Sequence, residues 1–306
     1  YLPEFGWQPI ILTAPLDQKP DQTYQIVETG YRNALAFWIR LFRLNLDEDL
    51  RKQVKQRFSV TAKKSLLDRL LTFAGEIVNY PDSDRGWKPF AVKAGAEVIR
   101  REGIEAIIST SAPMTVHTIA RELKLRHNIP WLADLRDLWS QNHNYSYSPV
   151  RRWFDRRLEL KTLSAADALI TVSQPWANEL ATLHRRKETY AITNGFDPDE
   201  MNILPAKVTD KFTITYTGLI YTGKQDPAKL FAALHELVSE KIMAPKDVEV
   251  RFYGTSENWL DKEIGKYGLS KIAKQYGFVS RQVAVEKQRE SQLLLQLGWE
   301  GQEEAG

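Results

Sequence analysis

Between residues 104 and 199 the chain alternates short apolar segments with amphipathic ones, and each apolar segment ends in polar residues. Such short apolar segments are typical of strands covered on both faces of a parallel sheet, and the amphipathic segments between them predict helices. The predicted strands are Ala106–Ile108, Trp131–Ala133, Ala168–Ile170 and Tyr190–Ile192. This order of strands and helices predicts an α/β fold.

Polar residues follow each of these strands. The clusters are Ser109–Pro113, Asp134–Asp137, Thr171–Ser173 and Thr193–Gly195. An open parallel sheet binds ligands at the carboxyl ends of its strands. The residues in these clusters are therefore candidates for a binding site.

A second series of strands and helices begins near Phe212, and its first helix is predicted to start at Asp226-Pro227. Two domains suit a chain of 306 residues. We predict a first domain at 1–200 with a mostly helical insertion at about 22–78, a second domain at 211–306 and a leucine-rich final helix through Leu293–Leu297. The starting residue Tyr1 and the end at Gly306 favour a fragment cut at both ends, and a complete protein with a frayed tail is the alternative.

The composition argues against several kinds of site. The chain has no cysteine, which excludes structural disulfides and thiolate metal sites, and no pair of its five histidines has a zinc-like spacing. No apolar run approaches the ~20 residues that span a bilayer. We therefore expect neither a metal site nor a spanning helix.

Residues 40–69 form a basic, amphipathic segment with nine basic and four acidic residues. Such a segment can lie on an anionic membrane surface or hold a phosphorylated acceptor, and a solvated helix face with basic residues is the alternative. Nucleic acid is not expected as a partner. Phe37, Trp38 and Phe42 fit a helix core better than a platform for base stacking.

Five segments together resemble the glycosyltransferases of the GT-B fold, in particular the family 4 type. They are residues 110–117, 130–139, 166–173, 193–197 and 216–224. The resemblance implies two Rossmann-like domains, an N-terminal one on the acceptor side and a C-terminal one that binds a nucleotide-sugar. Family members continue into a segment whose glutamates bind the donor, so the resemblance implies an incomplete C-terminal domain and a fragment that is inactive alone. Other Rossmann-like enzymes also carry Gly/Asn loops of this kind.

The reaction that the resemblance implies is transfer of a sugar from a nucleotide-sugar to an acceptor hydroxyl. It would be a retaining, hexosyltransferase-like enzyme of cell-surface glycan or exopolysaccharide synthesis, cytoplasmic or peripheral to the inner face of the membrane. The acceptor would be a glycan or a lipid-linked molecule. No cofactor is implied, because the nucleotide-sugar is a substrate and a cation can neutralise the leaving diphosphate in place of a metal.

Lys224 is the candidate for this cation, and it is placed among the catalytic and donor-binding residues. Gly218 would let the backbone approach the phosphates. A solvated lysine and a simple turn are the alternatives. Relatives often carry a second cation in this loop, where this chain has Leu219 and Tyr221. Asn194 and Gly195 resemble the loop at the domain junction and complete the predicted donor-binding set, and a tight turn is their alternative.

The predicted acceptor and sugar side consists of Asp134, Arg136 and His117, with Asp137 as a catalytic residue. Two carboxylates around an arginine can bind sugar hydroxyls or hold one another in a structural ion-pair network. Relatives often have a histidine where this chain has Arg136. For His117, a position on the surface of a helix is the alternative.

Two other functions remain open. A nucleotide-sugar epimerase shares the fold but needs no second substrate, and the long amphipathic insertion favours a transferase that handles an acceptor. A non-catalytic module that binds a nucleotide-sugar or a partner is the other alternative.

Overall fold

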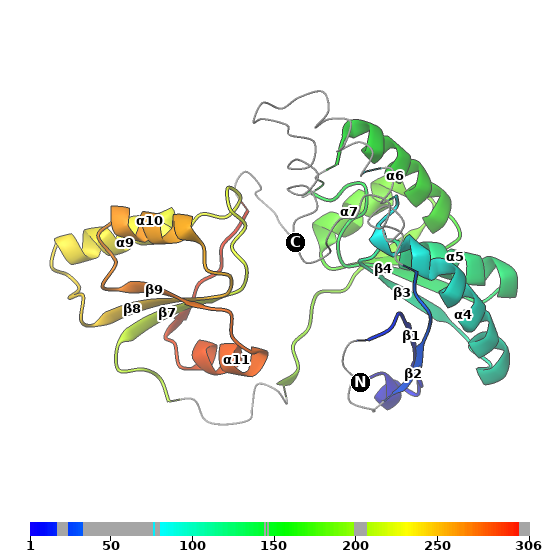
Figure 1. Cartoon of the computed structure of the whole chain (residues 1–306), viewed down its shortest axis with the longest axis horizontal. Helices are drawn as coiled ribbons and strands as arrows, with labels where there is room; N and C mark the ends of the chain where they lie inside the picture. Colours follow the sequence, from blue (N-terminus) through cyan, green and yellow to red (C-terminus); the bar gives the residue numbers. More distant parts are fainter. Residues whose placement is uncertain are drawn as a thin grey trace, which may run out of the picture. The chain divides into compact units, whose positions relative to one another are not determined.

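The computed structural model describes residues 1–16, 24–32, 76, 80–143, 145, 147–198 and 207–299. The chain divides into two compact units, Tyr1–Asn194 and Gly195–Ala305 (Figure 1). Each unit contains its own parallel sheet, so the sheets do not continue from one unit into the other. The predicted α/β fold with parallel sheets is confirmed.

The main sheet of the first unit has four parallel strands in the order β3-β4-β5-β6. They are β3 (Ile107–Ser111), β4 (Trp131–Leu135), β5 (Ala168–Thr171) and β6 (Glu188–Ala191). The helices are α4 (Lys88–Glu102), α5 (Thr115–His127), α6 (Pro149–Leu163) and α7 (Gln174–Leu183). Sequence order and spatial order coincide, as expected when each helix crosses over to the neighbouring strand.

One face of this sheet packs on a core and the other does not. Trp131, Ala133 and Leu135 of β4 are buried against Leu163 and Leu180. On the opposite face, Ile108 and Tyr190 are 59% and 50% exposed. The prediction of strands covered on both faces is therefore wrong for the outer strands β3 and β6, while Leu132 of β4 and Ile170 of β5 are half-buried on this face. On this face β3, β4 and β6 each carry one apolar and one polar side chain, and β5 carries Ala168 and Ile170.

Short elements precede this sheet. They are the 3-10 helices η1 (Leu2–Phe5) and η2 (Ser83–Trp87) and the parallel pair β1 (Ile10–Thr13) and β2 (Gln25–Glu28). The predicted, mostly helical insertion at about 22–78 falls largely outside the described residues; of those described, Gln25–Glu28 form strand β2 and Glu76 is helical. The basic segment 40–69 lies wholly outside them. None of the helices that the structure describes is long and apolar enough to cross a bilayer.

The sheet of the second unit has the order β10-β7-β8-β9 and is also parallel. Its strands are β7 (Phe212–Thr217), β8 (Val248–Tyr253), β9 (Ala273–Gly277) and β10 (Leu293–Leu294), and its helices are α9 (Ala228–Ser239), α10 (Asn258–Lys266) and α11 (Arg281–Arg289). Phe231, Leu234, Val250 and Phe252 lie in its core. The Asp226 carboxylate accepts a hydrogen bond from the Ala228 backbone N–H at 2.8 Å, which supports the predicted helix start.

The predicted leucine-rich final helix is wrong. The last described helix, α11, ends at Arg289, and Leu293 and Leu294 then pair with β7 as the edge strand β10. Gln292 N donates to Thr213 O at 3.1 Å and Leu295 N donates to Thr215 O at 2.9 Å. The backbone bonds to β7 take the place of helical bonds, so tertiary pairing overrides the helix propensity of leucine.

Candidate functional site

The carboxyl end of β4 carries Asp134, which the neighbouring strand orients. Thr110 and Asp134 are partners in the register of β3 and β4. The Thr110 hydroxyl donates to Asp134 Oδ2 at 2.8 Å. Asp134 is half-buried, so one face of its carboxylate is fixed by the sheet while part of it stays accessible. Such a carboxylate can accept hydrogen bonds from a sugar's hydroxyl groups.

Arg136 reaches across the sheet edge to Asn194. The Arg136 guanidinium (Nη2) donates to Asn194 Oδ1 at 2.5 Å, and both residues are exposed. The structure therefore brings together one residue from the predicted sugar side and one from the predicted donor-binding set. Arg136 forms no ion pair with Asp134 or Asp137 within the described residues, so the alternative of an ion-pair network among these three is wrong.

Asp137 is exposed, and the residues after it are anchored. Ser140 donates twice to Glu159 Oε2 of α6, from its backbone N at 3.0 Å and from its hydroxyl at 2.5 Å. Glu159 is fully buried, and Leu138 is 2% exposed. The hydrogen bonds between Ser140 and Glu159 thus hold the loop after β4 on the protein core. The exposed Asp137 carboxylate stays available to a ligand.

His117 lies inside the first unit and not on its surface. It has no exposed area. Trp131 Nε1–H donates to Ser109 Oγ at 2.8 Å, which leaves the Ser109 hydroxyl proton for His117 Nδ1, also at 2.8 Å. Burial lowers the pKa of His117 to about 3, so the ring is neutral.

The alternative of a surface histidine is therefore wrong. A side chain without exposed area touches no sugar here, and we leave His117 out of the proposed site. The sequence did contain a signal for its burial. Ala120 and Leu123 follow His117 at intervals of three, on the buried face of α5.

Two glycines meet at the carboxyl edge of the second sheet. Gly218 and Gly254 have φ values of 144° and 153°, which favour glycine. A Cβ on Gly254 would lie 1.9 Å from the carbonyl oxygen of Gly218. Gly218 N donates to Tyr253 O at 2.9 Å, and Gly254 N donates to Gly277 O at 3.0 Å. Sequence reasoning missed Gly254, although it directly follows strand β8 as Gly218 follows β7.

Gly195 lies at the first residue of the second unit and is exposed. Added to its backbone, a Cβ would have no atom within 4 Å. The described surroundings therefore do not require glycine at this position. Its predicted role in donor binding remains a proposal.

Lys224 is exposed in the loop between β7 and α9, and the aromatic rings of Trp299 and Tyr221 lie near it. Its ammonium lies 5.4 Å from the centroid of the Trp299 ring. The Tyr221 ring packs on Trp299 with centroids 4.9 Å apart. Gln225 ties the loop to the same segment, because its amide donates to Leu297 O at 2.9 Å. Sequence reasoning missed Trp299 and Gln225, since neither belongs to a polar cluster at a strand end.

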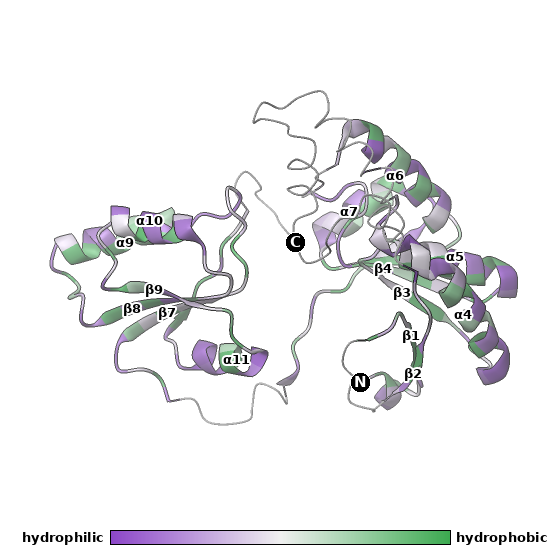
Figure 2. Cartoon of the chain, in the orientation of Figure 1, coloured by the Kyte–Doolittle hydropathy of each residue, from purple (hydrophilic) through white to green (hydrophobic). Residues whose placement is uncertain are grey.

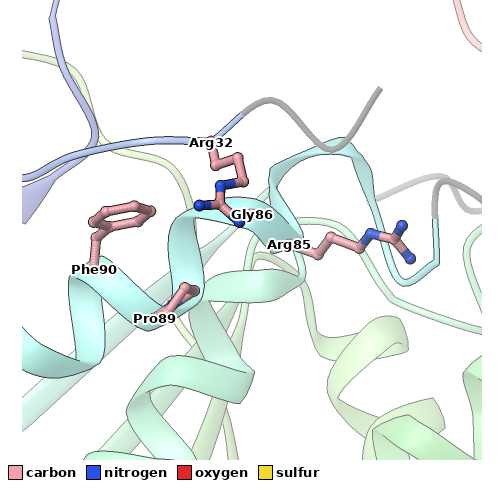
Figure 3. A pocket seen from close by; sticks show the side chains of 5 residues that line it. All are labelled: Arg32, Arg85, Gly86, Pro89 and Phe90. Atoms are coloured by element: carbon pink, nitrogen blue, oxygen red, sulfur yellow. The ribbon is translucent and has the colours of Figure 1, made fainter. Parts of the chain in front are cut away.

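A hollow of about 560 Å³ lies at the start of α4, lined by Arg32, Arg85, Gly86, Pro89 and Phe90. Figure 3 shows the Arg32 guanidinium over Gly86 and the Arg85 side chain pointing away from it. A cation beside an apolar floor of Pro89 and Phe90 can hold an anionic group with an apolar neighbour. The predicted site residues do not line this hollow.

Comparisons with known proteins give a family match and several remote structural likenesses. A sucrose-phosphate synthase from Thermosynechococcus elongatus is similar over 68% of this chain and 53% of its own, with 14% identity and a TM-score of 0.48. The galactosyltransferase WaaB of the lipopolysaccharide outer core is similar over 67% and 53%, with 11% identity and a TM-score of 0.43. A protein described as a UDP-N-acetylglucosamine 2-epimerase from Listeria monocytogenes is similar over 88% and 66%, with 13% identity and a TM-score of 0.42.

The present chain spans about half the length of the sucrose-phosphate synthase that it matches. No curated protein matches this chain. The model of Glycosyltransferase Family 4 matches residues 61–200, which include all of β3 to β6 and the helices between them. Residues 61–200 of this chain are therefore similar to Glycosyltransferase Family 4.

Proposed function

We propose that this chain transfers a sugar from a nucleotide-sugar donor to an acceptor hydroxyl. The observation that carries the proposal is the family 4 match, combined with polar side chains at the carboxyl edge of the same sheet. In this proposal residues 1–200 form the acceptor-side domain and residues 211–306 belong to the domain that binds the nucleotide-sugar. The epimerase and the non-catalytic module remain the alternatives.

The leaving diphosphate sets the main electrostatic requirement of this reaction, because it gains charge as the glycosidic bond breaks. A cation and an open backbone edge can both stabilise that charge. Lys224 supplies an exposed ammonium, and Gly218 supplies backbone without a Cβ at the end of β7. We therefore assign Lys224 and Gly218 to the diphosphate. Asn194 and Gly195 complete the donor-binding set.

We assign the sugar side to the carboxyl edge of β4. Asp134 is oriented by Thr110, and Arg136 is oriented by Asn194, so both polar groups have defined directions before a ligand binds. Asp137 is exposed next to them and is our candidate catalytic carboxylate. A group held in place in advance costs less entropy on binding.

We further propose a retaining reaction in the synthesis of a cell-surface glycan or exopolysaccharide. The acceptor is a glycan or a lipid-linked molecule, and the enzyme works in the cytoplasm or at the inner face of the membrane. Stereochemistry is tested by proton NMR of the first product formed. An inverted anomeric configuration contradicts the retaining assignment.

Binding of the donor's nucleotide is the direct test. The protein is titrated with UDP, GDP and ADP by saturation-transfer NMR, and one of the three is expected to bind. Lys224→Ala should weaken that binding, while Lys229→Ala on the exposed side of α9 should not. Absence of binding by all three contradicts the proposed donor site.

Product analysis separates transferase from epimerase. A transferase releases nucleoside diphosphate only as the acceptor is glycosylated, whereas an epimerase converts the nucleotide-sugar without any acceptor. Epimerised donor in the absence of acceptor would replace the proposed function with the alternative. Binding without either reaction, in a full-length protein supplied with glycan and lipid-linked acceptors, would favour the non-catalytic module.

A further inference from the structure

Helix α6 buries its charged residues and exposes apolar ones. Arg151, Asp155 and Glu159 are 4%, 2% and 0% exposed. Val150, Trp153, Phe154 and Leu160 are instead 51%, 51%, 49% and 38% exposed. A helix at the surface of a globular protein normally has the opposite arrangement. Figure 2 shows hydrophobic and hydrophilic residues mixed along α6.

The hydrogen bonds of the buried charged residues fix which face of the helix points into the protein. Arg151 Nε donates to Asp155 Oδ2 at 2.9 Å, and the Tyr145 hydroxyl donates to the same oxygen at 2.5 Å. Glu159 accepts from Ser140 on the same side of the helix. Removing any of these partners would leave a buried group without its hydrogen bond, which is costly. The polar face therefore fixes the apolar face toward solvent.

The exposed face is also strongly cationic. It carries Arg152, Arg156, Arg157 and Lys161, all exposed. The two acidic residues of α6 are those buried on the opposite side, so the exposed face of this helix has no carboxylate. At about 100° per residue, Trp153 and Leu160 fall near the middle of the exposed arc. Arg152 and Arg156 flank the arc on one side and Lys161 lies toward the other.

Aromatic rings reinforce this arrangement. The Arg157 guanidinium carbon lies 4.1 Å from the centroid of the Trp153 ring, and that of Arg152 lies 4.6 Å from the Tyr145 ring. The Tyr80 hydroxyl donates to Phe154 O at 3.1 Å. Tryptophan and tyrosine are enriched where a protein meets the headgroup region of a bilayer. Arginine can cover apolar surface with its stem while its charge stays in a polar layer.

We propose that the exposed face of α6 binds the surface of an anionic phospholipid bilayer. Trp153, Phe154 and Leu160 enter the boundary between headgroups and acyl chains, and the flanking arginines contact lipid phosphates. The occupant follows from charge complementarity, because this helix face has four cations and no anion. The inference does not depend on the glycosyl-transfer reaction, and it places the contact outside the basic segment 40–69.

Vesicle flotation tests the proposal. The protein is mixed with vesicles of phosphatidylcholine alone or of phosphatidylcholine with an equal amount of phosphatidylglycerol. We expect flotation with the anionic vesicles only. Each cation near an anionic surface contributes roughly fivefold to binding, so Arg152→Gln with Arg156→Gln should weaken binding about 30-fold. Arg185→Gln with Arg186→Gln, at exposed positions after α7, is the matched control and should bind as the unmodified protein does.

A labelled cysteine tests the position of the helix, because the chain has no cysteine of its own. Val150→Cys carries an environment-sensitive dye on the exposed face of α6, and Ala181→Cys carries it at an exposed position of α7. Anionic vesicles should shift the emission to the blue at position 150 and not at position 181. Circular dichroism and thermal unfolding establish that each variant is folded.

Three results would overturn the proposal. The first is equal binding of the control and the Arg152/Arg156 variant. The second is a dye at position 150 that is already shielded without vesicles, which means that another part of the chain covers the face. The third is shielding that grows with protein concentration, which assigns the face to a second copy of the chain.

Discussion

Gly254→Ala tests the close approach of the Gly218 and Gly254 backbones at the carboxyl edge of the second sheet. The added Cβ would lie 1.9 Å from the Gly218 carbonyl oxygen, which belongs to backbone and cannot rotate away. Alanine is also strained at a φ of 153°. Such backbone strain costs about 1–3 kcal/mol. Overpacking adds about 1–3 kcal/mol, so we expect a loss of roughly 2–6 kcal/mol in the free energy of unfolding.

Urea unfolding followed by circular dichroism measures this loss. Gly265→Ala is the matched control, because Gly265 lies in α10 and a Cβ there meets no atom within 4 Å. The control should gain about 0.5–1 kcal/mol, as alanine favours the helix. A Gly254→Ala protein whose stability stays within about 0.5 kcal/mol of the original would refute the close approach of these two backbones.

Other predictions concern charge and proton binding. In a full-length enzyme, Lys224→Ala should lower kcat by ~10²–10³ and Lys224→Arg should restore only part of it, because a guanidinium places its charge differently. Steady-state kinetics across donor concentrations measures this, and near-normal turnover would leave Lys224 a solvated lysine. His117 binds its proton far more weakly when folded, at a pKa of about 3 against 6.5, so the unfolded chain takes up the proton first as pH falls. Below pH ~6.5 this difference in proton binding should lower the free energy of unfolding by about 1.4 kcal/mol for each pH unit. His117→Leu should remove this part of the pH dependence, which urea unfolding at several pH values measures. Ser140→Ala should cost about 1–3 kcal/mol, since the buried Glu159 carboxylate loses a donor, and an unchanged urea midpoint would contradict that bond.

The strands and helices around the first sheet were predictable because apolar periodicity reports burial directly. The predicted strand at Trp131–Ala133 lies within β4, and in the second unit the helix predicted to start at Asp226-Pro227 begins at Ala228. Leu293 and Leu294 were placed in a helix instead. Their pairing with β7 joins residues far apart in sequence, and local pattern carries no information about such a partner.

The sequence predicted which candidate site residues lie at strand ends, but it did not predict their hydrogen-bond partners. Asp134 and Arg136 were identified from their place at the end of a predicted strand, but their partners lie elsewhere, Thr110 on β3 and Asn194 in the segment after β6. His117 was assigned to the sugar side of the site, with a helix surface as the alternative, and it lies in neither place. Its partner Ser109 lies on β3, and a single buried hydrogen bond satisfies the ring nitrogen that faces it. Such pairings depend on sheet register, which the sequence does not state.

The contact between Lys224 and Trp299 has an entropic consequence for any anion that the lysine binds. A free lysine side chain carries about 2 kcal/mol of rotamer entropy, and most of it is lost when the ammonium is fixed by a ligand. At 5.4 Å from the indole ring, the ammonium already has a contact before the ligand arrives. The ring stabilises it by only about 0.5–1 kcal/mol, which is weak enough for an anion to displace it. The tryptophan thus acts as a resting position that lowers the ordering cost of the next contact.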